Sequence, residues 1–166
     1  MDVALEKRQV ERAYELLAPV YDFIFDWIFA PGRAAAISGL DLQRNDSVLE
    51  VGIGTGLNLP LYPWSCHLTG IDLSQEMLDK AVERVQNLAM PNVLLKVMDA
   101  TSMDFGENEF DKAAATYTIS AVPDPVAVLR EMRRVVKPGG IIRCLEYTRP
   151  SSGIRRALTR LWEPWV

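Results

Sequence analysis

Cysteine and histidine are scarce in this chain of 166 residues, which contains two cysteines and one histidine. Two thiols are too few for a disulfide framework, and together with one imidazole they do not form the clustered ligands of a zinc site. We therefore expect no metal site. Free cysteine is among the most frequently buried residue types, so Cys66 and Cys144 are expected to be buried thiols in a reducing compartment.

Long apolar runs and an excess of basic residues are missing as well. No segment approaches the roughly 18 apolar residues of a membrane span, and the N-terminus, MDVALEKRQVER, lacks the apolar core of a signal peptide. A formal net charge of −4 is opposite in sign to the surface of most nucleic-acid-binding domains. The sequence therefore predicts a cytoplasmic protein without a nucleic-acid partner, and it limits any membrane contact to a peripheral one on the inner face.

The composition and length are those of one globular domain, residues 1–166. Apolar residues make up 49% of the chain and charged residues 24%, which is enough to bury a continuous core. In residues 1–40, apolar side chains recur on one helical face up to Tyr21, Pro31-Gly32 is expected to end a second helix near Phe29, and residues 33–40 are expected to form a third. We expect this region to be a helical lid.

From residue 47 onward, short apolar strands alternate with helices. Strands are expected at 47–53, 67–72, 92–98, 110–119 and 141–146, and helices at 56–61, 75–88, 125–135 and 152–162. Ser74 and Pro125 suit helix starts, and Lys137-Pro-Gly-Gly140 suits a turn. This order predicts an α/β fold with a mainly parallel sheet and helices on both faces, in which residues 47–146 form the core and 150–166 a C-terminal helix.

A glycine-rich turn directly follows the first predicted strand. Gly52, Gly54 and Gly56 of VGIGTG let the backbone bend sharply and approach a ligand closely. Their spacing is G-x-G-x-G, and it differs from the G-x-G-x-x-G motif that prepares a helix N-terminus for a dinucleotide pyrophosphate. A purely structural turn would also use glycine, so this motif indicates a ligand site only together with other features.

Acidic residues occur at the ends of three consecutive predicted strands. Glu50 lies in the first strand, Asp72 ends the second, and Asp99-Ala100 follows the third. Asp72 can accept hydrogen bonds from ribose hydroxyls, and Asp99 can accept one from an adenine amine, although singly Asp72 could cap a helix and Asp99 could start a turn. Open α/β sheets bind ligands at the carboxyl ends of their strands. Together these acids predict a site for an adenosyl compound.

Five segments resemble, in order, the successive motifs of class I S-adenosylmethionine-dependent methyltransferases: LEVGIGTG, TGIDLS, MDA, FDKAAATYTISAVPDP and LREMRRVVKPGG. The resemblance implies a Rossmann-like fold, S-adenosylmethionine as the cofactor, S-adenosylhomocysteine as the product, and no metal. The family fold has two more strands after the last helix, and because the chain ends at Val166 we expect these to be absent. The residues that the resemblance assigns to cofactor binding are Tyr21, Glu50, Gly52, Gly54, Thr55, Gly56, Asp72, Leu73, Met77, Asp99, Ala100 and Thr116.

Two parts of the sequence resemble different branches of this family. YELLAPVYDFIFDWIFAPGRAAAI and VGIGTGLNLPLYP resemble bacterial, Rhodobacter-type phosphatidylethanolamine N-methyltransferases, whereas CLEYTRPSSGIRRALTRLWEPW is nearer to UbiE-like quinone, thiol and other small-molecule methyltransferases. The methyl acceptor is therefore expected to be a lipid or a small molecule. Three interpretations stay open: phosphatidylethanolamine methylation at a membrane surface, methylation of a soluble quinone precursor or thiol, and a binding module without catalysis.

The candidate catalytic residues are Tyr14 and Tyr21 in the expected lid, and Tyr117 and Glu146 at strand ends. An amine or thiol acceptor must lose a proton before or during attack, so a base can assist. The resemblance also implies that Tyr21 closes over the cofactor and that Tyr117 lines the transfer site. His67 begins a strand at the opposite edge of the sheet, so we expect it to be structural or superficial.

Residues 21–29 and 153–166 carry side chains that suit a lipid surface. The first segment is rich in aromatic and branched apolar residues, and the second combines three arginines with leucine and tryptophan. Basic residues beside tryptophan and leucine are typical of interfacial helices on anionic lipid. We expect peripheral membrane contact through these segments; the alternative is that both pack on the sheet.

Overall fold

The structure of this chain is a computed structural model, and it describes residues 29–146. Tyr14 and Tyr21 lie outside the described residues, as does the expected membrane segment 153–166. The helices expected before residue 28 and after residue 150, and the expected absence of final strands, also fall on parts of the chain that are not described.

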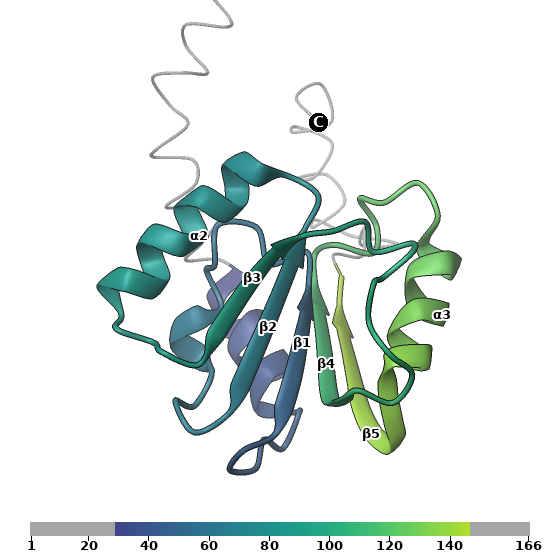
Figure 1. The fold of residues 1–166 in the computed structure, drawn as a ribbon, viewed down its shortest axis with the longest axis horizontal. Coiled ribbons are helices and arrows are strands. Elements are labelled where there is room, and N and C mark those ends of the chain that lie inside the picture. Colours follow the sequence, from purple (N-terminus) through teal and green to yellow (C-terminus); the bar gives the residue numbers. More distant parts are fainter. Residues whose placement is uncertain (1–28, 147–166) are drawn as a thin grey trace, which may run out of the picture.

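Within residues 29–146, five parallel strands form one sheet in the order β3-β2-β1-β4-β5 (Figure 1). The strands are β1 (Ser47–Val51), β2 (His67–Asp72), β3 (Val93–Val97), β4 (Phe110–Thr116) and β5 (Val136–Leu145). The order reverses between β1 and β4, because the chain builds β1 to β3 toward one edge and then returns to the other side of β1. Such a reversal is where open α/β sheets bind ligands, at the carboxyl ends of the strands.

Helices α2 (Gln75–Asn87) and α3 (Pro125–Val135) begin where the sequence predicts. In α2 the Ser74 hydroxyl accepts a hydrogen bond from the backbone N–H of Met77, and in α3 Asp124 accepts one from Ala127. Pro125 suits the first turn of α3 because that position needs no N–H donor. A further helix covers residues 29–38, and η1 (Leu59–Leu61) is a short 3-10 helix.

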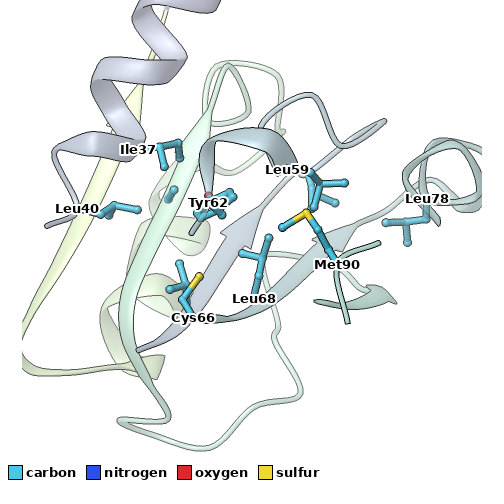
Figure 2. Close-up of a cluster of buried hydrophobic side chains, with 11 residues drawn as sticks. Ile37, Leu40, Leu59, Tyr62, Cys66, Leu68, Leu78 and Met90 are labelled. Atoms are coloured by element: carbon cyan, nitrogen blue, oxygen red, sulfur yellow. The ribbon is translucent and has the colours of Figure 1, made fainter. Parts of the chain in front are cut away.

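Two buried apolar layers cover the two faces of the sheet. One layer joins Ile37 and Leu40, from the first described helix and the turn after it, to side chains of η1 and α2 (Figure 2). The other layer joins the sheet to Val128 and Met132 of α3. Adjacent strand residues point to opposite faces, so both faces of the central strands are apolar. The α/β fold with helices on both faces is confirmed.

Two of the expected helix boundaries are wrong. Pro31 and Gly32 lie inside the helix over residues 29–38 and do not end it. The lack of a side chain at Gly32 has a packing reason, since a Cβ there would lie 3.0 Å from the Tyr117 hydroxyl. The helix expected at 56–61 is reduced to η1, because Gly56 has a φ of +79°, which a right-handed helix does not accommodate.

The turn expected at residues 137–140 lies within β5 and does not precede it. The register of β5 against β4 shifts between Phe110 and Lys112, which makes room for the extra residues. Gly139 has a φ of +82°, as a glycine turn requires. The turn is therefore present, but the strand continues on both sides of it, as in a β-bulge.

The two cysteines differ in exposure. Cys66 is buried as expected, but Cys144 is exposed, so that expectation is wrong. The physical reason is its position in β5, which is the last strand of the sheet that residues 29–146 form. In the same part of the chain, no helix is both long enough and apolar enough to cross a bilayer.

Candidate functional site

Most of the described candidate residues meet at the carboxyl edge of the sheet. Strand β1 ends beside β2 and β4, so the glycine turn that follows Val51 lies next to Ile71 and Ala115. Asp72 pairs with Val97 at the end of β3, two residues before Asp99. The candidate residues that share this edge are Gly52, Gly54, Thr55, Gly56, Asp72, Leu73, Met77, Asp99, Ala100, Thr116, Tyr117 and Glu146.

Glycine is favoured at the three positions of the turn for different structural reasons. All have positive φ, +70° at Gly52, +56° at Gly54 and +79° at Gly56. A Cβ at Gly52 would overlap the Thr118 side chain, and one at Gly56 would lie 2.6 Å from Leu59. A Cβ at Gly54 would meet no atom within 4 Å. The outer glycines are therefore needed for packing, whereas the middle one leaves space where a ligand can approach the backbone.

Asp72 fastens the glycine turn to the end of β2. Its Oδ2 accepts a hydrogen bond of 2.8 Å from the backbone N–H of Gly54, and its Oδ1 accepts one of 2.9 Å from Ser74. An ionised carboxylate can accept about four hydrogen bonds. The half-buried Asp72 thus holds the turn and retains acceptor positions for a pair of ribose hydroxyls.

Asp99 is exposed and starts a turn. Its Oδ1 accepts hydrogen bonds from the backbone N–H and the hydroxyl of Thr101, at 2.8 and 2.7 Å. The bond from the backbone, and then that from the hydroxyl, lower the pKa of Asp99. This is the alternative role that its residue type suggests. An adenine contact from Asp99 or Ala100 stays a prediction.

Glu50 lies in a buried polar cluster at the reversal of strand order. Its side chain is 1% exposed, and its Oε1 accepts a hydrogen bond of 2.6 Å from the Asn58 amide. The same amide donates at 2.9 Å to the hydroxyl of Thr116. Asn58, which precedes η1, therefore ties β1 to β4 on the face covered by the helix over residues 29–38.

Burial raises the pKa of Glu50 from 4.5 to about 7, and the Asn58 amide, the Tyr62 hydroxyl and the Arg33 guanidinium each lower it in part. The Tyr62 hydroxyl is near enough for this effect but does not reach hydrogen-bond geometry with Oε2. Among the described residues, Glu50 Oε2, Asn58 Oδ1 and the Tyr62 hydroxyl are buried without a hydrogen-bond partner. The two acceptor oxygens, Glu50 Oε2 and Asn58 Oδ1, suit an ammonium group or an ordered water. The amino-acid end of S-adenosylmethionine carries an ammonium group, so the donor and acceptor chemistry fits this cofactor.

Tyr117 lies beside the cluster with a strained backbone. Its φ is +57°, which is uncommon for a bulky residue, and its ring centroid is 5.0 Å from that of Phe29. Burial raises the pKa of Tyr117, Arg33 lowers it, and Glu146 raises it. At neutral pH the hydroxyl is therefore protonated and suited to donate a hydrogen bond. A catalytic role for Tyr117 stays a prediction.

Comparison with known proteins decides the family. A family model described as a methyltransferase domain matches residues 49–144, more than half of the chain. The chain belongs to the methyltransferase family. A phosphatidylethanolamine N-methyltransferase of Cereibacter sphaeroides is 38% identical over 94% of this chain and 78% of that protein. A demethylmenaquinone methyltransferase of Staphylococcus aureus is 30% identical, covering 99% of this chain and 71% of that protein.

A solved structure shows the same fold as this methyltransferase-family chain. The YcgJ protein of Bacillus subtilis superposes with a TM-score of 0.69 at 21% identity, over 79% of this chain. The chain spans 56% of the length of that structure. At this identity the likeness shows the fold alone, and it agrees with the class I, Rossmann-like arrangement of the methyltransferase family.

Two residues of the buried cluster at the candidate site were not predicted from the sequence. Asn58 and Arg33 are 3% and 7% exposed, although both types are usually on the surface. A signal was present at Asn58, a single polar residue within the apolar stretch LNLPL. Arg33 follows Pro31-Gly32, where we expected a helix boundary, so its burial had no sequence signal. His67 is exposed at the start of β2, as predicted.

The remaining candidates differ in what the structure says of them. Leu73 and Met77 are 73% and 41% exposed at the carboxyl edge, and their contact with a cofactor stays a prediction. The backbone carbonyl of Thr55 accepts a hydrogen bond of 3.2 Å from Arg84 of α2.

Within residues 29–146, no group of three His, Cys, Asp or Glu side chains could hold a metal ion.

The raised pKa of Glu50 predicts a pH-dependent stability. The folded protein holds this proton more tightly than the unfolded chain, so the contribution of Glu50 is greatest below pH 4.5 and is lost as the pH rises through about 7. Glu50→Gln keeps the acceptor for Asn58 and removes the charge. We expect it to stabilise the protein at pH 8 relative to wild type by up to about 3 kcal/mol, and by little at pH 5.

Urea unfolding of both proteins at pH 5, 6, 7 and 8 measures this difference. Glu83→Gln, on the exposed side of α2, is the matched control and should show no such trend. A difference between Glu50→Gln and wild type that does not change with pH would contradict the assignment.

Proposed function

We propose that this chain catalyses methyl transfer from S-adenosylmethionine to a lipid or small-molecule acceptor, with phosphatidylethanolamine as the first candidate. The observation that carries the proposal is the pair of carboxylates beside one glycine turn. Asp72 binds the backbone of that turn, and Glu50 lies one strand away with an unpartnered oxygen. The turn also lies at the reversal of strand order, where α/β sheets bind ligands.

When bound, the cofactor supplies a methyl group that its sulfonium already activates. The chain then has to bind, orient and exclude water, and alignment alone can lower such a barrier by about 7–11 kcal/mol. Asp72 would accept the ribose hydroxyls, and Glu50 with Asn58 would accept the ammonium group. Thr116 and Tyr117, at the end of β4, would border the side from which the acceptor approaches.

The choice of acceptor rests on similarity and on the ends of the chain. The relative at 38% identity is named for phosphatidylethanolamine, whereas the one at 30% is named for demethylmenaquinone. Residues 21–29 are rich in apolar and aromatic side chains, and residues 153–166 combine such side chains with three arginines, as suits an anionic lipid surface. These features favour a lipid headgroup, and a quinone precursor is the second candidate.

Binding and turnover assays test this proposal together. We expect calorimetry to show binding of S-adenosylhomocysteine and none of NAD. Labelled S-adenosylmethionine is then offered with phosphatidylethanolamine in anionic vesicles, a demethylated quinol, or an alkyl thiol. We expect label in the lipid, and co-flotation of the protein with the same vesicles at low salt.

The possible outcomes separate the alternatives. If only the quinol or the thiol becomes labelled, the methyl acceptor is a small molecule and not phosphatidylethanolamine. Cofactor binding without turnover on any acceptor would favour a binding module. Absence of S-adenosylhomocysteine binding would refute the proposed function.

A further inference from the structure

Glu146 holds the segment that follows β4, with both of its carboxylate oxygens engaged. Its Oε1 accepts a hydrogen bond of 2.7 Å from the backbone N–H of Ile119, and its Oε2 accepts one of 2.6 Å from the hydroxyl of Ser120. Both bonds are short, as expected for an ionised acceptor. The two partners lie 27 and 26 residues earlier in the chain, so the contact joins the end of β5 to the end of β4.

The held segment begins with Tyr117, whose backbone conformation needs support. A φ of +57° is unfavourable for a bulky non-glycine residue, and such strain persists where neighbouring contacts fix it. The N–H of Tyr117 donates at 2.7 Å to the carbonyl of Leu145, the residue before Glu146. Residues 145 and 146 therefore fix the segment on both sides of its strained turn.

The conformation of Tyr117 determines where its ring lies. The ring packs against Phe29, and the hydroxyl lies close to the backbone of Gly32. Thr116, directly before it, is hydrogen-bonded to Asn58 of the buried cluster. A change of backbone at Tyr117 would therefore move the ring away from the edge at which the cofactor and the acceptor are proposed to meet.

We propose that Glu146 is a positioning residue that sets the conformation of Tyr117 and thereby the acceptor side of the site, and that it is not the general base. This inference rests on the proposed function, because it concerns the acceptor side of that site. Protonation of Glu146 during turnover would weaken the hydrogen bonds that its carboxylate accepts from Ile119 and Ser120, because a neutral acceptor binds more weakly than an ionised one. As a positioning residue, it needs only acceptor geometry and keeps both bonds throughout turnover.

Conservative and non-conservative variants distinguish the two roles. In Glu146→Gln the amide oxygen can accept from Ile119 and the amide nitrogen can donate to the Ser120 hydroxyl, so both bonds survive without a basic group. We expect kcat/KM for the acceptor within about threefold of wild type in Glu146→Gln, and about 10- to 100-fold lower in Glu146→Ala, because small displacements near reacting groups are costly. Ser120→Ala, which removes one bond, should fall between them.

Hydrogen exchange supplies a readout that needs no substrate. We expect the Ile119 amide to exchange faster in Glu146→Ala and at the wild-type rate in Glu146→Gln. Glu109→Ala is the matched control, since Glu109 also accepts a hydrogen bond from a backbone N–H, that of Gly106, at the opposite end of β4. It should change neither turnover nor exchange at Ile119.

Two results would overturn the proposal. One is Glu146→Gln as inactive as Glu146→Ala, with normal exchange at Ile119, which would show that the basic group itself is needed. The other is unchanged exchange at Ile119 in Glu146→Ala. If the wild type does not bind S-adenosylhomocysteine, the proposed function is refuted instead. The hydrogen-exchange comparison would still show whether Glu146 holds the backbone at Ile119.

Discussion

Replacement of Asp72 by alanine should weaken the binding of S-adenosylhomocysteine by a factor of about 5 to 150, equivalent to about 1–3 kcal/mol for the lost contacts to ribose. The structure adds a second contribution. The same carboxylate accepts hydrogen bonds from the N–H groups of Gly54 and Ser74, and both donors lose their partner in the variant. The glycine turn is then no longer fastened to β2, so affinity falls through the turn as well as through the ribose.

Calorimetric titration of Asp72→Ala and Asp72→Asn measures these two contributions. Asparagine keeps one acceptor oxygen, so its loss of affinity should be smaller than that of alanine. Asp79→Ala is the matched control, because Asp79 is an exposed acid on α2 whose contact is with Gln75 of the same helix. Unchanged affinity in Asp72→Ala would show that the ribose lies elsewhere.

Alanine at Gly52 should mainly impair folding and alanine at Gly54 mainly ligand binding, although the two residues belong to one turn. At Gly52 a Cβ would overlap Thr118, and the φ of +70° is unfavourable for alanine. Overpacking costs about 1–3 kcal/mol and a left-handed backbone about 1–2 kcal/mol more. We therefore expect Gly52→Ala to lower the free energy of unfolding by about 3 kcal/mol or to prevent folding.

At Gly54 a Cβ meets nothing within 4 Å, so Gly54→Ala should fold with a loss of only about 1–2 kcal/mol from its φ of +56°. Its methyl group would stand where the ligand approaches the turn, so we expect S-adenosylhomocysteine binding to be strongly reduced. Thermal unfolding and calorimetry separate the two variants. Wild-type affinity in folded Gly54→Ala would contradict the proposed place of the cofactor.

The arrangement of the sheet could be predicted because its signals are local and repeated. Apolar strands separated by helices with clear start residues, such as Ser74 and Pro125, allow one parallel sheet. The carboxyl edge follows from that topology, and this is why Asp72 and the glycine turn were placed together correctly. The sharp bend expected at VGIGTG is present, and all three of its glycines have positive φ.

The details that the sequence did not predict depend on tertiary packing. Pro31 and Gly32 are strong helix-ending signals, yet both lie within the helix over residues 29–38, where the absence of a side chain at Gly32 leaves room for the Tyr117 hydroxyl. Glu50 was expected at an open edge of the sheet, but it is buried. Leu49 and Val51 face α3, so Glu50, which lies between them in β1, faces the opposite side of the sheet, under the helix over residues 29–38. Its partner Asn58 comes from a segment where we expected a regular helix.

The sequence did not determine which hydrogen bonds the individual acidic residues make. Asp99 and Glu146 were chosen by their position at strand ends, and the structure shows both of them binding nearby backbone groups. The turn that Asp99 starts was one of the two roles that its residue type suggested. The partners of Glu146 come from a loop 26 and 27 residues earlier in the chain, which the sequence alone does not bring to it. This is why the edge could be located while the tasks of its residues could not.

The structure of the complex with S-adenosylhomocysteine tests the central claim most directly. The claim predicts the ribose hydroxyls within hydrogen-bond distance of Asp72, the amino-acid end near Glu50 and Asn58, and the backbone of Gly54 against the ligand. A ligand bound away from the carboxyl ends of β1 and β2, with Asp72 contacting only Gly54 and Ser74, would contradict it.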